Sequence, residues 1–178
     1  MTRSFLFSGF GGQGLLFAGK FVAYKGLLED KHISWLPSYG PEMRGGTASC
    51  SVIVGDEPVG SPVVLNPDVL VAMNLPSLDR YEDAVVPGGY IFADSSLIER
   101  KVKRTDVNVV YIPATQMANE NGLDTLANMI ITGNILKTFG QAGDSTIDAA
   151  LGKCISARHA DLLEFNKKAI DMGIAFEG

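Results

Sequence analysis

Residues 4–20 read "SFLFSGFGGQGLLFAGK", and this stretch decides the fold. The run from Arg3 to Ser8 is short and apolar and ends in glycine, which predicts a strand. Residues 13–28 have the length of a helix and carry apolar side chains around most of its circumference. Only Lys20 and Lys25 interrupt that surface, so we predict a helix that is buried on more than one side.

Two glycines inside the predicted helix, Gly19 and Gly26, need a separate explanation. Each costs about 1 kcal/mol relative to alanine in a helix interior. Close packing of the helix backbone against a sheet or a partner accounts for them, because only glycine leaves room for it.

Short runs rich in Val, Ile and aromatic residues follow, separated by turn signals. Five strands are predicted, at 32–39 (which Pro37 is expected to end), 47–55, 68–73, 88–94 and 107–113. Helices are predicted within 74–85, 123–140, 144–154 and 156–176. We expect Asp124 to cap the second of these helices and Gly140 to end it, with Asp144 or Ser145 capping the third.

The Val- and Ile-rich runs lack strict alternation of apolar and polar residues, which indicates a sheet covered on both faces. Together with the order of strands and helices, this predicts one α/β domain over residues 1–178. We expect three layers, α/β/α, with a mixed, mostly parallel sheet and a helical C-terminal third.

The composition excludes several classes of protein. The 178 residues are 46% hydrophobic and carry a formal charge of −5, which argues against a nucleic-acid partner, since phosphate backbones need clustered Lys and Arg. No apolar run is long enough to cross a bilayer, and the first residues do not form a signal peptide, so we expect a cytoplasmic protein with no membrane partner.

Cys50 and Cys154 are far apart, and His32 and His159 are isolated. We therefore expect no metal site, and no iron–sulfur cluster held by this chain alone.

The first glycine stretch satisfies G-x-G-x-x-G through Gly9, Gly11 and Gly14, after a strand and before a helix. In that context backbone N–H groups and a helix N-terminus cradle phosphate. A dinucleotide site also expects an acidic residue at the end of the second strand, and "WLPSYG" supplies none. Glu29 and Asp30 come too early, and no Lys-Ser/Thr follows the glycines as in a Walker loop. Two interpretations stay open: contact with an anion, or a tight strand-to-helix turn packed on another subunit.

A second glycine-rich stretch, "SYGPEMRGGT" at 38–47, holds large side chains between Gly-Pro and Gly-Gly pairs. Its large residues are Tyr39, Glu42, Met43 and Arg44. Large side chains on a loop fixed by proline and glycine are typical of a recognition surface. The fork of Arg44 suits a carboxylate or phosphate, although pairing with Glu42 or a buried carbonyl would also explain it.

The two stretches, "FSGFGGQGLLFAGK" and "PSYGPEMRGGTASCSVIV", together resemble the gamma subunit of the 2-oxoacid:ferredoxin oxidoreductases. That group includes the pyruvate, 2-oxoglutarate and branched-chain 2-oxoacid enzymes. Later segments resemble it in the same order, among them "NPDVLVAMNLPSLDRY", "GGYIFADSS", "YIPATQMANENG", "LANMIITGNILK" and "LLEFNKKAIDMG". The indolepyruvate oxidoreductase small subunit shares the G-x-G-G-Q-G start, but its second loop reads more like "GMSQRGG" than "GPEMRGG".

The resemblance implies a division of labour between subunits. Enzymes of this family oxidatively decarboxylate a 2-oxoacid with thiamine diphosphate, transfer the acyl group to CoA and pass electrons through iron–sulfur clusters to ferredoxin. This chain has too few cysteines for clusters and no "GDG" to hold Mg²⁺-diphosphate; "GDE" at 55–57 and "GDS" at 143–145 are near misses. Thiamine, Mg²⁺ and the clusters are therefore expected on partner alpha, beta and delta chains, and this chain is expected to be a non-redox subunit.

We expect residues 9–14 and 38–47 to lie near each other at the carboxyl edge of the first two strands, facing the alpha subunit. The expected anion or CoA contacts are Gly9, Gly11, Gly12, Gln13, Gly14 and Arg44, and the expected interface residues are Tyr39, Glu42, Met43 and Arg44. No residue is assigned a catalytic proton transfer, because thiamine supplies the nucleophile. The alternatives are a purely structural subunit and a free-standing NAD-type oxidoreductase.

Overall fold

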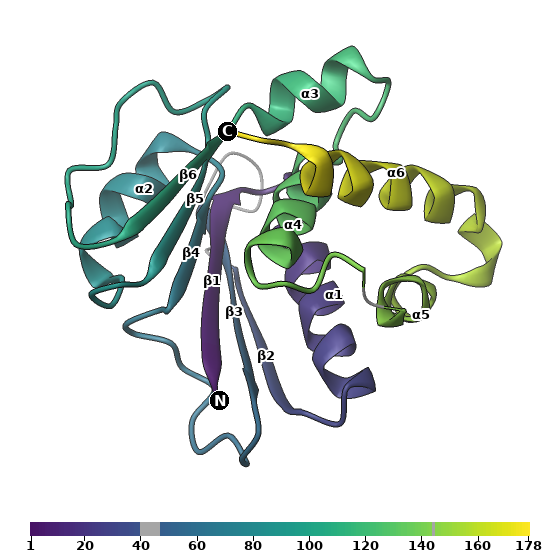
Figure 1. Ribbon diagram of the computed structural model, residues 1–178, viewed down its shortest axis with the longest axis horizontal. Coiled ribbons are helices and arrows are strands. Elements are labelled where there is room, and N and C mark those ends of the chain that lie inside the picture. Colours follow the sequence, from purple (N-terminus) through teal and green to yellow (C-terminus); the bar gives the residue numbers. More distant parts are fainter. Residues whose placement is uncertain (40–46, 144) are drawn as a thin grey trace.

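The computed structural model describes residues 1–39, 47–143 and 145–178 of the chain (Figure 1). The strands are β1 Arg3–Phe10, β2 His32–Tyr39, β3 Thr47–Gly55, β4 Val69–Ala72, β5 Tyr90–Asp94 and β6 Asn108–Ile112. The helices are α1 Leu15–Leu28, α2 Leu75–Tyr81, α3 Ala114–Glu120, α4 Ala127–Thr138, α5 Thr146–Cys154 and α6 Asp161–Ala175. Two single 3₁₀ turns, Glu82–Ala84 and Ala157–His159, follow α2 and precede α6.

The strands form one sheet in the order β2-β3-β1-β4-β5-β6. Strand β3 is antiparallel to both of its neighbours, whereas β1, β4, β5 and β6 pair in parallel. Because β2 and β1 are each antiparallel to β3, they run in the same direction as each other. The prediction of a mixed, mostly parallel sheet is confirmed.

Helices cover the sheet on both faces, as the sequence predicts. On one face α1 and α4 pack over Phe5, Phe7 and Phe92, with α5 and α6 outside them (Figure 1). On the other face Leu78 of α2 and the segment after β5 cover Leu6 and its neighbours. The alternating side chains of β1 thus enter two separate cores, which is the three-layer α/β/α arrangement.

Glycines allow the helices to approach their neighbours closely. A Cβ atom at Gly19 would overlap the sulfur of Cys50, and one at Gly26 would lie 2.7 Å from Val54, so α1 lies directly on β3. This confirms that the glycines inside the first helix serve close packing. Helices α4 and α6 meet in the same way, because Cβ atoms at Gly133 and Gly173 would overlap backbone atoms of the opposite helix.

Two local predictions, for Pro37 and Asp124, are wrong. Pro37 does not end β2, which continues to Tyr39; β2 is an edge strand, where the missing proline N–H need not serve the ladder. Asp124 does not cap α4, whose N-cap is Leu126 without a side-chain hydrogen bond. Ser145 occupies the N-cap position of α5 but its side chain makes no capping bond, and Asp144 lies outside the described residues.

Helix α3, between β6 and α4, is an element that the sequence pattern does not predict. Gly140 does end α4, with φ of 71° and its N–H donating to the carbonyl of Lys137 at 3.0 Å.

Candidate functional site

The glycine turn, residues 11–14, joins the carboxyl end of β1 to the start of α1. After β1, the chain passes through α1 to β2 and β3, which lie on one side of β1 in the sheet. The next strand, β4, lies on the other side of β1. The turn therefore lies where the strand order reverses, which is where open α/β sheets bind ligands.

Three glycines of the motif have internal structural reasons. Gly12 and Gly14 have φ of 93° and 73°, a region that favours glycine. A Cβ atom at Gly14 would also overlap the amide of Asn128, whose Nδ2 donates to the Gly14 carbonyl at 2.9 Å. A Cβ atom at Gly9 would overlap the side chain of Gln13. A tight turn thus accounts for Gly9, Gly12 and Gly14, whether or not a ligand is bound.

The side chain of Gln13 fastens the turn to the neighbouring strand. Its Oε1 accepts from the Phe10 N–H at 2.6 Å, and its Nε2 donates to the Met73 carbonyl just after β4 at 3.0 Å. Its backbone N–H donates to the Phe10 carbonyl at 3.3 Å and is engaged in the turn itself.

Backbone donors remain available beside Gln13. Within the described residues, no acceptor takes a hydrogen bond from the amides of Gly11, Gly12 or the first three residues of α1, 15–17. The first turn of a helix always leaves such N–H groups, and they attract anions.

A cavity of about 170 Å³ opens beside the turn. Its described lining comes from the turn, the end of β4, the segment after β5, α3 and the approach to α4: Gly12, Gln13, Met73, Leu97, Thr115, Ala118, Asn119, Thr125 and Ala127. None of these lining residues has a titratable side chain. The cavity can therefore bind and orient a ligand by amide, hydroxyl and apolar contacts, without an acid or base of its own.

Asp94, at the carboxyl end of β5, positions one wall of this cavity. Its buried carboxylate accepts from the Thr115 hydroxyl at 2.5 Å, the Thr115 N–H at 3.2 Å and the Ser96 N–H at 3.1 Å. Since the Thr115 hydroxyl donates to Asp94, it can offer only acceptor lone pairs to anything else. Asp94 is not among the site residues predicted from the sequence, although an acid at the end of the apolar run "YIFAD" was a usable signal.

The second glycine-rich stretch begins at the same edge. Tyr39 and Gly9 both oppose Ala48 of β3, so their backbones are two strand spacings apart, about 10 Å. The predicted contacts Glu42, Met43 and Arg44 lie outside the described residues.

The geometry of the edge does not fit dinucleotide binding. Strand β3 separates β2 from β1, so an acid at the end of β2 would stand one strand further from the glycine turn than in a dinucleotide fold. The described part of the chain also contains no group of three or more His, Cys, Asp or Glu residues placed to hold a metal.

The two cysteines are separate, protonated thiols. Burial raises the pKa of Cys50 to about 12 and that of Cys154 to about 11. An iron–sulfur cluster normally takes four cysteine thiolates, and the sequence contains two cysteines. Among the helices of the described residues, none is both long and apolar enough to span a membrane.

Fold and site define an α/β protein with a glycine turn at the switch point of its sheet and no acid, base or metal centre among the described residues that line the adjoining cavity. Residues 4–176 match the family model of pyruvate ferredoxin/flavodoxin oxidoreductase. The chain belongs to this family, and within it corresponds to the gamma subunit of 2-oxoacid:ferredoxin oxidoreductases, as the sequence resemblance predicts.

Two curated relatives illustrate the range of the family. The chain is 43% identical over 136 residues to ketoisovalerate oxidoreductase subunit VorA of Methanothermobacter thermautotrophicus, covering 76% of this chain but 28% of that protein. It is 32% identical to 2-oxoglutarate synthase subunit KorC of Methanocaldococcus jannaschii, covering 94% of this chain and 92% of KorC. The chain thus spans about a third or less of the VorA relatives that it matches.

Solved structures share the fold. The gamma subunit of a keto/oxoacid ferredoxin oxidoreductase from Geobacter sulfurreducens superposes with a TM-score of 0.83 at 27% identity, covering 98% of this chain and 95% of that one. A 2-oxoglutarate:ferredoxin oxidoreductase from Magnetococcus marinus, solved with 2-oxoglutarate, coenzyme A and succinyl-CoA, gives 0.87 at 23% identity and covers 98% and 30%. The second likeness concerns the fold alone.

Proposed function

We propose that this chain is a non-redox subunit of a cytoplasmic complex that converts a 2-oxoacid to an acyl-CoA with ferredoxin as electron acceptor. In this proposal its glycine turn, together with Arg44, forms part of the CoA site against the alpha subunit. The observation that carries the ligand role is the set of unengaged backbone amides at the switch point, beside a cavity whose described lining has no titratable side chain.

The amides of Gly11, Gly12 and the first turn of α1 suit the phosphates of CoA, because donors at a helix start stabilise an anion. The hydroxyl of Thr115, with its proton directed to Asp94, suits a ligand N–H or O–H on the cavity side. This chain would hold and orient CoA. Thiamine diphosphate on a partner would supply the nucleophile, and no described residue of this cavity moves a proton.

The same edge carries apolar side chains that a partner would cover. Phe10, Leu75 and Leu97 are 39%, 39% and 43% exposed; Phe10 is the last residue of β1, and Leu75 and Leu97 follow the carboxyl ends of β4 and β5. We place the alpha subunit here, with thiamine- and cluster-bearing beta and delta chains completing the complex and ferredoxin reached through it. Alternatively, the chain would be the small subunit of an indolepyruvate oxidoreductase, and it would contact its partner through the same ends of the strands.

A second candidate is an interaction subunit without ligand contact. The observation that favours it is that Gly9, Gly14 and Gln13 are each explained by contacts within this chain, either in the turn or with Met73 and Asn128. In this case Tyr39, Glu42, Met43 and Arg44 would be anchors of the subunit interface, since large aromatic and arginine side chains carry binding energy when buried.

Arg44→Ala in the reconstituted complex separates the two candidates, with Arg158→Ala, an exposed arginine between α5 and α6, as the matched control. We expect the KM for CoA to rise about tenfold or more, because a charge-assisted contact to phosphate is lost. Assembly, followed by size-exclusion chromatography, is expected to remain intact. An unchanged KM in an intact complex would remove the ligand role, and loss of assembly would favour the interface role.

A further inference from the structure

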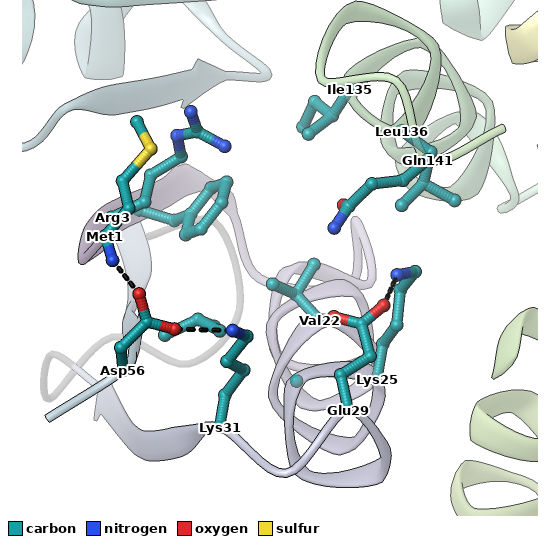
Figure 2. A pocket seen from close by; sticks show the side chains of 13 residues that line it. Met1, Arg3, Val22, Lys25, Glu29, Lys31, Asp56, Ile135, Leu136 and Gln141 are labelled. Carbon is teal, nitrogen blue, oxygen red and sulfur yellow. Dashed lines mark hydrogen bonds and ion pairs between the residues drawn. The ribbon is translucent and has the colours of Figure 1, made fainter. Parts of the chain in front are cut away.

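A second cavity lies at the opposite edge of the sheet, where β1 begins and where α1 and α4 end (Figure 2). Its volume of about 200 Å³ corresponds to roughly six or seven water molecules at about 30 Å³ each. Phe5, Val22 and Ile135, all buried, form an apolar floor. This cavity lies outside both the predicted site and the proposed CoA site.

Positive groups outnumber carboxylates along its described lining. Lys25, only 3% exposed, pairs with Glu29 one turn further along α1, while Lys31 and the amine of Met1 share Asp56 (Figure 2). Arg3 has no carboxylate within ion-pair distance among the described residues. Unlike the other cations of this lining, Arg3 therefore makes no ion pair with a described carboxylate.

Arg3 is held in place without using its hydrogen-bond donors. Its guanidinium lies 3.7 Å from the centre of the Phe139 ring, and no described residue accepts a hydrogen bond from it. Burial lowers the pKa of Arg3, and Asp68 opposes this from a distance. The Asp68 carboxylate is already bonded to the Ser4 amide and hydroxyl, each at 2.7 Å. A guanidinium that is held in place and has free N–H donors can bind a carboxylate through two parallel hydrogen bonds.

Gln141 approaches the same cavity from the other side. Its backbone N–H ends α4 by donating to the Leu136 carbonyl at 2.7 Å, and its side-chain amide is directed toward the middle of the cavity, across from Arg3 (Figure 2). No described residue hydrogen-bonds that side-chain amide. Backbone N–H groups such as that of Lys31 bond several of the carbonyls at the ends of α1 and α4, which leaves fewer free carbonyl oxygens facing the cavity.

We propose that this cavity binds a small aliphatic carboxylic acid. The carboxylate would bind Arg3 and the Gln141 amide, and the hydrocarbon chain would lie on Phe5, Val22 and Ile135. An inorganic anion would leave the apolar floor unused, and a neutral alcohol would leave Arg3 without its acceptor. The site is independent of the glycine turn, since the two lie at opposite edges of the sheet.

Titration of the full-length, ¹⁵N-labelled chain with 3-methylbutanoate tests this, with 3-methylbutan-1-ol and inorganic phosphate as reference ligands at constant ionic strength. We expect saturable shifts of the amide signals of Val22, Ile135 and Gln141, which neither reference ligand reproduces. Arg3→Gln is expected to weaken binding about tenfold or more, and Gln141→Ala several-fold. Arg80→Gln, which removes an arginine lying over Tyr81, is expected to leave binding unchanged.

The proposal is overturned if 3-methylbutanoate gives no saturable shifts, or if the alcohol or phosphate gives the same shifts. It is also overturned if Arg3→Gln binds as well as the parent chain. Should Arg3→Gln fail to fold, Gln141→Ala decides, because its side chain makes no contact that folding requires: unchanged affinity in that variant overturns the proposal, and weakened affinity supports it.

Discussion

At the scale of single residues, Gln13 illustrates how a glycine turn is held without a ligand. One side chain satisfies the Phe10 N–H and the Met73 carbonyl, and so ties the start of α1 to the end of β4. A turn fixed in this way keeps its remaining amides pointing in constant directions, which a binding surface needs.

Gln13→Ala is expected to lower the free energy of unfolding by about 1–2 kcal/mol, because the partly buried Met73 carbonyl and the exposed Phe10 N–H lose their partner. Gln116→Ala is the matched control; its side chain bonds Glu120 on the exposed side of α3, and we expect a loss below about 0.5 kcal/mol. Urea unfolding followed by circular dichroism measures both. Equal losses for the two variants would contradict the role given to Gln13.

The thiols make stability depend on pH. Burial raises the pKa of Cys50 to about 12 and of Cys154 to about 11, so the folded chain keeps both protons where the unfolded chain, with a thiol pKa of about 8.5, releases them. The stability contributed by the protonated thiols is therefore present below about pH 8.5 and is lost as the pH rises toward 11.

We expect the free energy of unfolding to fall above about pH 9, with a slope of at most about 1.4 kcal/mol per pH unit for each thiol. Urea unfolding between pH 8 and 11 measures this, and Cys154→Ala removes one thiol from the comparison. If the slope of Cys154→Ala equalled that of the parent chain, the prediction for that thiol would be wrong.

At the scale of elements, the contact between α4 and α6 decides how the C-terminal third packs. Gly133 and Gly173 bring the two helix backbones together, and Asn134 adds a hydrogen bond from its Nδ2 to the Gly173 carbonyl at 3.0 Å. Side chains of any size at these two positions would separate the helices and open the core between them.

Gly133→Ala is expected to destabilise the chain by about 2–4 kcal/mol, because the added methyl group overlaps the backbone of Ile170. Gly152→Ala is the control: this glycine lies in α5 with nothing near its Cβ position, so alanine should be neutral or stabilise by up to about 1 kcal/mol. Thermal unfolding distinguishes the two. A stabilising Gly133→Ala would contradict the close contact.

Local sequence patterns were sufficient to predict part of the fold. We could predict the strands and the buried first helix, because both are marked by apolar runs. The reason for Gly19 and Gly26 could also be predicted, because glycines inside a helix indicate close packing. Pro37 could not be interpreted correctly without knowing that β2 is an edge strand, and that depends on β3 pairing between β2 and β1.

The candidate site was predicted only in part. The glycine turn has a local motif, and its position at the carboxyl edge could be inferred from the strand that precedes it. Asp94 and Thr115 are 21 residues apart in sequence and meet only because β5 and β6 are neighbours, so no local pattern joins them. Arg3 and Gln141 come together through the packing of α4 beside β1, which no periodicity indicates.

At the scale of the whole molecule, the two edges of the sheet differ. The carboxyl edge carries the glycine turn and the exposed Phe10, Leu75 and Leu97, whereas the opposite edge carries the cavity of Arg3 and the exposed loop residue Leu65. We assign assembly to the carboxyl edge, because it exposes three large apolar side chains, one of which, Leu97, lines the cavity that a partner would close.

Leu97→Glu is expected to reduce co-purification with partner chains about tenfold or more, since a charge would be placed in an apolar contact. Leu65→Glu makes the same change at a side chain that is 77% exposed on the opposite edge, and assembly should be unaffected. Pull-down from co-expressed subunits, with thermal unfolding to verify folding, measures both. If only Leu65→Glu disrupted the complex, the assignment of the edges would be reversed.

The central position of β1 has a consequence for how the chain is made. Strand β1 is synthesised before both of its partners, β3 and β4, which are not complete until residues 55 and 72 have been added. At about 5–20 residues per second, the apolar "FLF" stretch waits several seconds without a partner strand. Nascent chains of this subunit should therefore depend on a holding chaperone more than chains whose first strand lies at the edge of a sheet.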